Sequence, residues 1–427
     1  MISNPFTELG INENIAQSLI ENNITQPTEI QQKAIPILLK GENDFIGLAQ
    51  TGTGKTAAFG LPLLQHINAK RQGIQALVLS PTRELGQQIA KQIAIFAKYL
   101  PHIATRAVYG GIPLGPQIRA LKKAPQILVA TPGRLIDLIE RRAVDLARVT
   151  YMVLDEADEM LNMGFQPAIN QIFSFLPQEK SIWLFSATMP QEINRLVHRY
   201  MAKNHMRVEI SPSHVVNPNI EHQYMVCPAD TKQSALQVLL DADRSKQSII
   251  FCRTKATAQR MAQSLMHQGV HADSLHGDLS QSKRDKVMRD FKSTKLQVLV
   301  ATDVAARGID VKDLYYVIHY NLPEQFEYYT HRSGRTARAG KKGISLCLVT
   351  QQEVKTVKQI SNKLGIQFKQ IASPDRQGLE KKRLENWVKK VEKAPAARTN
   401  AALVQQAEEA FSKLSKEELI AKLVANF

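Results

Sequence analysis

The chain of 427 residues is 44% hydrophobic and 22% charged, and its formal net charge at pH 7 is +16. This length exceeds what one compact core organises, and the composition excludes a disordered or collagen-like chain, so two or more folded domains are expected. The basic excess indicates a polyanionic partner, most commonly nucleic acid, although a protein that binds membrane surfaces would share this charge.

The three cysteines lie far apart in the chain, at Cys227, Cys252 and Cys347. They match neither a disulfide framework nor a zinc-ligand pattern, which fits a reducing compartment. The N-terminal residues lack the basic and apolar segments of a signal peptide, and no apolar run approaches the ~18 residues that cross a bilayer. We therefore expect a cytoplasmic protein without a membrane span.

Residues 30 to 205 alternate short apolar runs with longer stretches of helical periodicity. Strands that are apolar throughout and separated by helices are typical of a parallel sheet covered on both faces. The expected strands are DFIGLA, ALVLS, ILVAT, YMVLD and SIWLFS.

A phosphate-loop pattern, AQTGTGKT at residues 49–56, lies between the DFIGLA strand and a helical stretch. Its glycines would let backbone N–H groups surround a phosphate at the start of a helix. Lys55 would reach the β and γ phosphates of a nucleotide, and the Thr56 hydroxyl would hold magnesium. The expected contacts along the loop are Thr51, Gly52, Thr53, Gly54, Lys55 and Thr56.

Two adjacent acids, Asp155 and Glu156, end the expected strand in YMVLDEADEML. An acid at this place beside a phosphate loop is typical of a magnesium ligand, and a neighbouring carboxylate can take a proton from an attacking water. We assign Asp155 to the metal and Glu156 to the general base. A solvated acidic helix start is the alternative.

A polar stretch near residues 205 to 220 contains Pro212 and Pro218 and is expected to link this domain to a second one. A second series of apolar runs follows, formed by SIIFC, residues 274–276, VLVAT, YYVIHY and SLCLVT. LVAT occurs in both series, at residues 128–131 and 299–302, and VLSPTRELGQQIA aligns with IFCRTKATAQRMA in the same order. These colinear matches predict duplication of one α/β domain.

The second copy lacks a phosphate loop and carries YYTHRSGRTARAG instead. Its Arg332, Arg335 and Arg338 are three residues apart, so two or three guanidinium groups are expected to face the same way on a helical turn. A solvated or nucleic-acid-binding surface is the ordinary interpretation of such a cluster. Because this domain has no phosphate site of its own, we expect these arginines to reach across a cleft into the first domain's site, as an arginine finger does.

Several motifs together resemble the DEAD-box family of ATP-dependent RNA helicases. They are AQTGTGKT, DEAD at residues 155–158, SAT at 186–188, ARGID at 306–310 and HRSGRTAR at 331–338. The resemblance implies two tandem RecA-like parallel-sheet domains, residues 1–210 and 219–366, with ATP and Mg²⁺ held between them. An all-helical extension, residues 367–427, completes the expected α/β architecture.

The resemblance also implies contacts to the base and the closed site. In PTEIQ, which resembles the family's adenine motif, Gln31 would hydrogen-bond adenine and Phe6 would support this contact. Ile24 stands where the family often has an aromatic residue, so apolar contact with the base is expected there. Ser333 stands where an apolar residue is common. The second domain would contribute Gly308, Asp310, His331, Arg335 and Arg338.

Matching segments of the two domains would bind the RNA backbone. Thr131 and Thr302 end the duplicated LVAT strands, where a hydroxyl and the N–H groups of the next helix can meet a phosphate. Ser186 and Thr188 would link hydrolysis to this RNA face. Backbone contacts predict little sequence preference and strong salt dependence. The implied residues are Pro81, Thr82, Arg83, Gly110, Gly111, Thr131 and Arg134, then Arg253, Thr254, Gly277 and Thr302.

The resulting hypothesis is an RNA-stimulated ATPase that opens short RNA duplexes locally without travelling along them. ATP and RNA together would favour closure of the two domains, and closure would bend one strand. Two alternatives stay open: an ATP-gated RNA clamp or ribonucleoprotein-assembly factor with little unwinding, and a DNA helicase of related architecture.

The extension is expected to be helical, with apolar stripes at residues 384–391 and 403–414. Ser415 and Glu418 form a capping-box pattern that opens a last helix. The stripes need cover, either from the second domain or from a second copy of the chain. Residues 378–391 weakly resemble the helical region of cold-shock-type bacterial DEAD-box helicases, which favours a homodimer as the sharper alternative.

Overall fold

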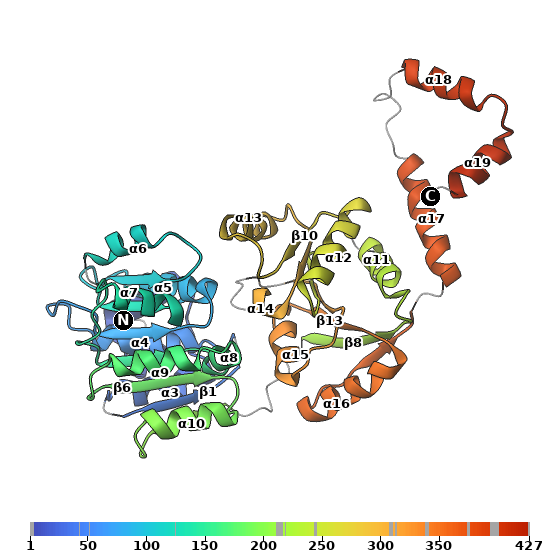
Figure 1. Ribbon diagram of the computed structural model, residues 1–427. Helices are drawn as coiled ribbons and strands as arrows, with labels where there is room; N and C mark the ends of the chain where they lie inside the picture. The colour runs from blue at the N-terminus through green and yellow to red at the C-terminus, as the bar shows by residue number, and fades with distance from the viewer. Residues whose placement is uncertain are drawn as a thin grey trace.

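Short strands form two parallel sheets, each covered by helices (Figure 1). The computed structural model describes residues 4–41, 43–50, 52–123, 125–210, 217, 219–242, 246–306, 311, 314–337, 341–373, 376–392 and 401–425. We call residues 4–210 the first lobe, residues 217–373 the second lobe and residues 376–425 the helical tail.

The first lobe contains a seven-stranded sheet in the order β3-β4-β2-β5-β6-β1-β7. Along β1, Phe45 faces one hydrophobic cluster and Ile46 faces the other, as expected for a strand buried on both sides. The strands are β1 (Phe45–Leu48), β2 (Ala76–Leu79), β3 (Thr105–Val108), β4 (Ile127–Ala130), β5 (Tyr151–Leu154), β6 (Ser181–Ser186) and β7 (Met206–Glu209). The helices are α1 (Pro5–Glu8), α2 (Glu13–Glu21), α3 (Glu29–Leu38), α4 (Lys55–His66), α5 (Arg83–Phe96), α6 (Leu114–Leu121), α7 (Pro132–Glu140), α8 (Ala157–Asn162), α9 (Gln166–Ser174) and α10 (Gln191–Tyr200).

The second lobe contains another seven-stranded sheet, in the order β10-β11-β9-β12-β13-β8-β14. Its strands are β8 (Ile220–Val226), β9 (Ser248–Phe251), β10 (Ala272–Leu275), β11 (Val298–Ala301), β12 (Tyr316–His319), β13 (Gly343–Val349) and β14 (Lys369–Ile371). Its helices are α11 (Lys232–Ala242), α12 (Lys255–His267), α13 (Gln281–Lys292), α14 (Asp303–Ala306), α15 (Phe326–Ser333), η2 (Gln351–Glu353) and α16 (Val354–Leu364).

The two sheets have the same strand order, place for place, so the predicted duplication is confirmed as a duplicated topology. The two LVAT segments form β4 and β11 and the first residue after each, and both strands lie second from the same edge. Likewise β1, which precedes the phosphate loop, corresponds to β8. Equivalent strand ends therefore lie at equivalent places in the two sheets.

The sequence prediction missed strands β3, β7, β8 and β14. Three of these are edge strands with solvent-exposed residues, and their sequences lack a continuous apolar run. The predicted linker was therefore placed too early, because Met206–Glu209 pairs with β1. The predicted boundary at residue 366 also falls before β14, which pairs with β8.

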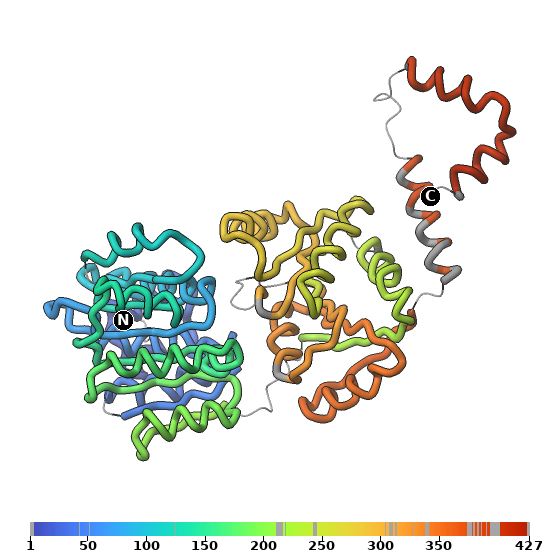
Figure 2. The backbone as a smooth tube through the Cα atoms, in the orientation of Figure 1, coloured from blue at the N-terminus to red at the C-terminus, as the bar shows by residue number. Residues whose placement is uncertain are grey.

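The helical tail consists of α17 (Arg376–Glu392), α18 (Ala401–Phe411) and α19 (Lys416–Ala425). α17 contacts α11, whereas α18 and α19 lie away from both lobes (Figure 2). The predicted capping box is confirmed, because the Ser415 N–H donates to Glu418 Oε2 at 2.9 Å and the Glu418 N–H donates to Ser415 Oγ at 3.1 Å. Among the described residues, no helix combines the length and the apolarity that a membrane crossing requires.

Candidate functional site

The phosphate loop joins β1 to α4 and is already folded round its lysine. Gly52 and Gly54 have φ angles of 89° and 94°, a left-handed conformation that favours glycine. The Lys55 ammonium is buried and donates to the Ala49 carbonyl oxygen at 2.9 Å. Its remaining donors are available to an anion at the N-terminus of α4. Thr51 lies outside the described residues.

Gln31 ties α3 to this loop. Its Oε1 accepts from the Thr28 N–H at 2.9 Å, completing a capping box, and its Nε2 donates to the Gly54 carbonyl oxygen at 3.0 Å. A Cβ on Gly54 would lie 2.3 Å from that nitrogen, so the close approach requires glycine. The structure thus brings Gln31 to the phosphate loop, while its contact with adenine stays a prediction.

Phe6 and Ile24 lie in the hydrophobic core beside α3. Phe6 is fully buried in α1, and Ile24 packs against the same cluster. Phe6 can therefore act on the nucleotide site only through packing. A cavity of about 350 Å³ adjoins the loop and is lined by the start of α3, residues 187–189 and the end of β7.

Asp155 follows β5 directly and is buried next to the phosphate loop. Burial raises the pKa of its carboxyl to about 7, although the nearby Lys55 charge opposes this shift. No cluster of three or more acidic, histidine or cysteine ligands occurs among the described residues. Magnesium is commonly held by one carboxylate together with substrate phosphates and water, so Asp155 and Thr56 fit a nucleotide-bound Mg²⁺.

Glu156 has a left-handed backbone, with φ 50° and ψ 52°, at the start of α8. This conformation is uncommon for a residue with a Cβ and is typical of functional sites where the surrounding structure enforces it. Here the Glu156 N–H donates to the Asp155 carboxylate at 3.0 Å. The chain turns sharply, and the two predicted acids therefore stand side by side at the end of β5.

Asp158 connects this turn to the end of β6. Its Oδ2 accepts from both the backbone N–H and the hydroxyl of Thr188, at 3.0 and 2.9 Å. The Asp158 N–H in turn donates to Ser186 Oγ at 3.3 Å. The predicted linking residues are therefore hydrogen-bonded to the acidic segment, and a shift of either strand end would move the other.

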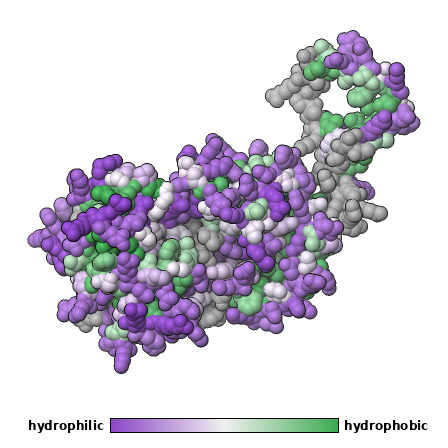
Figure 3. Space-filling view, viewed as in Figure 1, coloured by the Kyte–Doolittle hydropathy of each residue, from purple (hydrophilic) through white to green (hydrophobic). Residues whose placement is uncertain are grey.

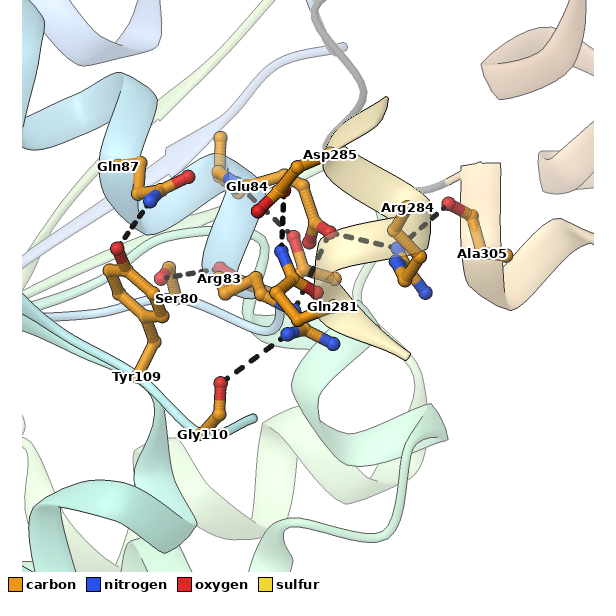
Figure 4. Close-up of polar contacts among 12 residues, drawn as sticks. Ser80, Arg83, Glu84, Gln87, Tyr109, Gly110, Gln281, Arg284, Asp285 and Ala305 are labelled. Carbon is orange, nitrogen blue, oxygen red and sulfur yellow. Dashed lines mark hydrogen bonds and ion pairs between the residues drawn. The ribbon is translucent and has the colours of Figure 1, made fainter. Parts of the chain in front are cut away.

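The predicted RNA contacts of the first lobe cluster at the ends of β2, β3 and β4. Thr82 caps α5, and its hydroxyl accepts from the Leu85 N–H at 3.3 Å. Arg83 Nη1 donates to the Gly110 carbonyl oxygen at 3.5 Å, as Figure 4 shows. Thr131 caps the start of α7. Of the remainder, Pro81 is buried, Gly111 is exposed, and Arg134 donates through Nη2 to the Ile112 carbonyl oxygen at 3.0 Å.

The second lobe repeats this arrangement. Thr254 caps α12, where its hydroxyl accepts from the Thr257 N–H at 3.1 Å, just as Thr82 caps α5. Arg253 is exposed, Gly277 follows β10, and Thr302 follows β11. The expectation that Thr131 and Thr302 end equivalent strands is confirmed.

Beside the predicted RNA-binding residues, the lobes meet through a contact that the sequence analysis missed. Arg284 Nη2 on α13 lies 2.8 Å from Glu84 Oε1 on α5 (Figure 4). Arg284 also donates to the Ala305 carbonyl oxygen at 3.4 Å. In the sequence, Arg284 resembles the other lysine and arginine residues of α13, and only its burial in the structure distinguishes it from them.

The arginine-rich segment is only partly as expected. The expectation that Arg332 faces the cleft is wrong, because it is buried in the second lobe and forms two hydrogen bonds to Asp303, at 2.5 and 2.6 Å. Its guanidinium also lies over the Phe251 ring. His331 does reach the first lobe, with Nδ1 3.3 Å from Glu159 Oε1. Arg335 follows α15, whereas Gly308, Asp310 and Arg338 lie outside the described residues.

Ser333, placed where an apolar residue was expected, is buried in a polar network. Its hydroxyl lies 2.8 Å from Ser345 Oγ, which also contacts His319 Nε2 at 3.0 Å and the Tyr329 hydroxyl at 3.1 Å. Because each buried hydroxyl has a partner, the serine carries no desolvation penalty of an unpaired group. This network holds α15 against β12 and β13.

The second lobe neutralises its own counterpart of the phosphate-loop lysine. Lys232 begins α11 after β8, as Lys55 begins α4 after β1. Its buried ammonium lies 2.9 Å from Glu353 Oε2, which also accepts from the Thr350 N–H at 2.8 Å. The Glu353 carboxylate thus neutralises the Lys232 ammonium, which would otherwise attract an anion.

Comparisons with known proteins agree with this geometry. Residues 28–196 match the model of the DEAD/DEAH box helicase family, residues 231–340 match the helicase conserved C-terminal domain, and residues 379–426 match the helical domain of probable ATP-dependent RNA helicases. The chain is 43% identical over 355 residues to the DEAD-box ATP-dependent RNA helicase CshA of Bacillus cereus, covering 83% of this chain and 67% of that protein.

Two solved structures resemble the whole arrangement. Dbp5 of S. cerevisiae bound to RNA and ADP BeF3 matches with a TM-score of 0.80 at 31% identity, covering 91% of this chain and all of that one. Mss116p bound to ssRNA and AMP-PNP matches with a TM-score of 0.78 at 27% identity, covering 96% of this chain and 86% of that one.

Proposed function

The chain belongs to the DEAD-box family of ATP-dependent RNA helicases, and we propose that it opens short RNA duplexes locally, without travelling along them. Its enzymatic class is ATP hydrolysis coupled to RNA helicase activity. The observation that carries the finer proposal is the equivalent placement of Thr131 and Thr302 at the ends of β4 and β11. A strand bound at both helix starts must follow the combined surface of two lobes, and a duplex cannot follow such a bend intact.

Hydrolysis would take place where the lobes meet. Lys55 and the N-terminus of α4 hold the phosphates, and Glu156 takes a proton from the attacking water. Asp155 and Thr56 would hold a Mg²⁺ ion, which neutralises charge on the phosphates when bound. Arg335, and Arg338 beyond the described residues, would stabilise the charge that develops in the transition state. The first lobe alone would then bind ATP without cleaving it.

RNA would be held through its backbone. The expected contacts come from helix starts, threonine hydroxyls and arginines, which meet phosphate and sugar rather than base edges. Dbp5 and Mss116p are described as bound to RNA or ssRNA, which supports the same class of ligand for this chain. Little sequence preference and a steep loss of affinity with salt are therefore expected.

The test is RNA-stimulated ATPase measured together with strand displacement on duplexes of about 10 and about 30 base pairs. Displacement of the short duplex alone supports local opening. ATPase stimulated by RNA without displacement of either duplex favours the clamp alternative, and equal stimulation by DNA of matched sequence rejects RNA as the specific ligand.

A homodimer through the helical tail is a second proposal. Large apolar side chains are exposed on all three tail helices, and green patches mark the tail in Figure 3. They are Val388, Val391, Leu403, Val404, Phe411, Ile420, Leu423 and Val424. Light scattering on the full chain tests this proposal. A mass of two chains that falls to the mass of one chain in Phe411→Asp supports it, and a mass of one chain at concentrations up to about 100 μM rejects it.

The cytoplasmic location stays a prediction.

A further inference from the structure

A carboxylate and an imidazole meet across the two lobes close to the hydrolysis site. Glu159 lies on α8, four positions after the predicted magnesium ligand Asp155, and His331 lies on α15 of the second lobe. Glu159 Oε1 is 3.3 Å from His331 Nδ1, and the side chains are 3% and 16% exposed. The pair is thus largely buried between the lobes, directly after the predicted acids along the chain.

The Glu159 carboxylate is buried, so the groups that contact it affect its stability. A buried ionised carboxylate is costly unless hydrogen bonds or an opposite charge stabilise it. The imidazole of His331 supplies one such group, and it comes from the other lobe. Separation of the lobes would break this contact and open that side of Glu159 to water. The contact therefore contributes to the closed arrangement specifically.

The contact also determines where the imidazole carries its proton. A ring nitrogen facing a carboxylate must be an N–H donor, so Glu159 fixes the proton of His331 on Nδ1 and sets the plane of the ring. His331 Nε2 is buried, and among the described residues it has no hydrogen-bond partner. It is therefore the ring atom left for a group that enters the closed site. A carboxylate that orients an imidazole in this way is a recurring device in catalytic sites.

We infer that Glu159 is a positioning residue for His331: its carboxylate holds the imidazole in one orientation and one tautomer when the lobes close round ATP and RNA. The inference rests on the proposed function, since it concerns the same hydrolysis site. It assigns Glu159 no contact with the nucleotide. It predicts that Glu159 influences turnover only through His331.

The test is a double-mutant cycle on the full chain with Glu159→Gln, His331→Ala and the combined variant. Glu159→Gln keeps the shape of the side chain and removes its charge. We expect it to lower RNA-stimulated kcat by about tenfold, the range expected for a hydrogen bond to a charged group, with KM for ATP within about twofold. In the His331→Ala background the same substitution should change kcat by less than about twofold.

A thermal-stability measurement distinguishes a Glu159 that orients His331 in the closed state from a Glu159 that only stabilises the first lobe. RNA plus a non-hydrolysable ATP analogue should raise the Tm of the wild type more than that of Glu159→Gln, while the Tm values without ligands stay within a few degrees. Glu179→Gln, which removes an exposed carboxylate from the same lobe, should behave as wild type in both assays.

Multiplicative effects on kcat in the double variant, or equal Tm losses with and without ligands, would overturn the inference. If Glu159→Gln does not fold, Glu159→Asp takes its place in the double-mutant cycle. The aspartate side chain is one methylene shorter, so its carboxylate lies farther from His331. A wild type without any RNA-stimulated ATPase would reject the proposed function and this inference together. An active wild type with independent effects would reject the pairing alone.

Discussion

Glu84 and Arg284 form an ion pair that joins the two lobes beside the predicted RNA contacts, with Glu84 Oε1 and Arg284 Nη2 2.8 Å apart. The side chains are 20% and 10% exposed, so the pair is largely removed from solvent. Glu84 lies next to the predicted RNA residue Arg83, which is 3.5 Å from the same oxygen. One carboxylate therefore contacts both the other lobe and a predicted RNA-binding residue.

Arg284→Gln should weaken RNA-dependent closure. Loss of a largely buried charge-assisted hydrogen bond between the lobes is expected to raise the RNA concentration for half-maximal ATPase by about tenfold. KM for ATP at saturating RNA should change little, because the nucleotide loop is in the first lobe. RNA titrations of ATPase measure both quantities. Arg289→Gln on the exposed side of α13 is the matched control, and an equal effect of that variant would contradict the role of the pair.

Glu156→Gln should abolish turnover while ATP and RNA still bind. The amide cannot accept a proton from water, and loss of a general base typically lowers kcat by about 10²- to 10⁴-fold. The left-handed turn at this residue is held by its backbone N–H, which the substitution keeps. Steady-state ATPase and binding of a fluorescent ATP analogue check the two halves of this prediction. Retained turnover would remove Glu156 from the role of base.

The core of each sheet could be predicted from the sequence, whereas the edges could not. Strands such as β4 and β11 are buried on both faces and form continuous apolar runs, which identify them without further information. β7, with the sequence MRVE, exposes three of its four residues and resembles a linker. Its identity as a strand depends on its pairing with β1, a tertiary contact that no local pattern encodes.

The same distinction applies to the site. The phosphate loop, the two acids and the capping threonines are local motifs, and the structure places them at strand ends as expected. Arg332 and Arg335 look alike in sequence, yet the first is paired with Asp303 inside its own lobe. Arg284 and Glu159 each contact a residue of the opposite lobe. Such contacts depend on how two folded units meet, which residue spacing alone cannot reveal.

Binding of Mg²⁺ and ATP should strengthen as the pH rises through about 7. Burial raises the pKa of the Asp155 carboxyl to about 7, so below that pH the free protein carries a proton at this position. A metal ion requires the carboxylate, and its binding must therefore release the proton. Calorimetry at pH 6.5 in two buffers of different ionisation enthalpy should report this proton release. It should be absent in Asp155→Asn, and equal affinities at pH 6 and pH 8 would contradict the prediction.

The stability of the folded chain should fall as the pH drops below about 6.5, because burial lowers the pKa of His222 and of His319 in the second lobe. Burial lowers the pKa of His222 to about 4 and that of His319 well below its ordinary value. Their unfolded forms gain protons near pH 6.5, whereas the folded forms do not, so acid favours unfolding in the window from about 6.5 down to about 4. Asp155 acts in the opposite direction, since its folded pKa is raised.

The His222 contribution can be isolated by comparing the wild type with His222→Gln, in which the Asp155 contribution is unchanged. A shift of this size corresponds to about 3 kcal/mol at most. Urea unfolding at pH 7.5 and pH 5 measures the free energy of unfolding of both proteins. The wild type should lose about 2 kcal/mol more than the variant over this interval, since each pH unit between the two pKa values contributes about 1.4 kcal/mol. Equal losses in both proteins would show that His222 is protonated in the folded state, and its hydrogen bond to the Tyr329 hydroxyl at 2.7 Å would then have to persist with a charged ring.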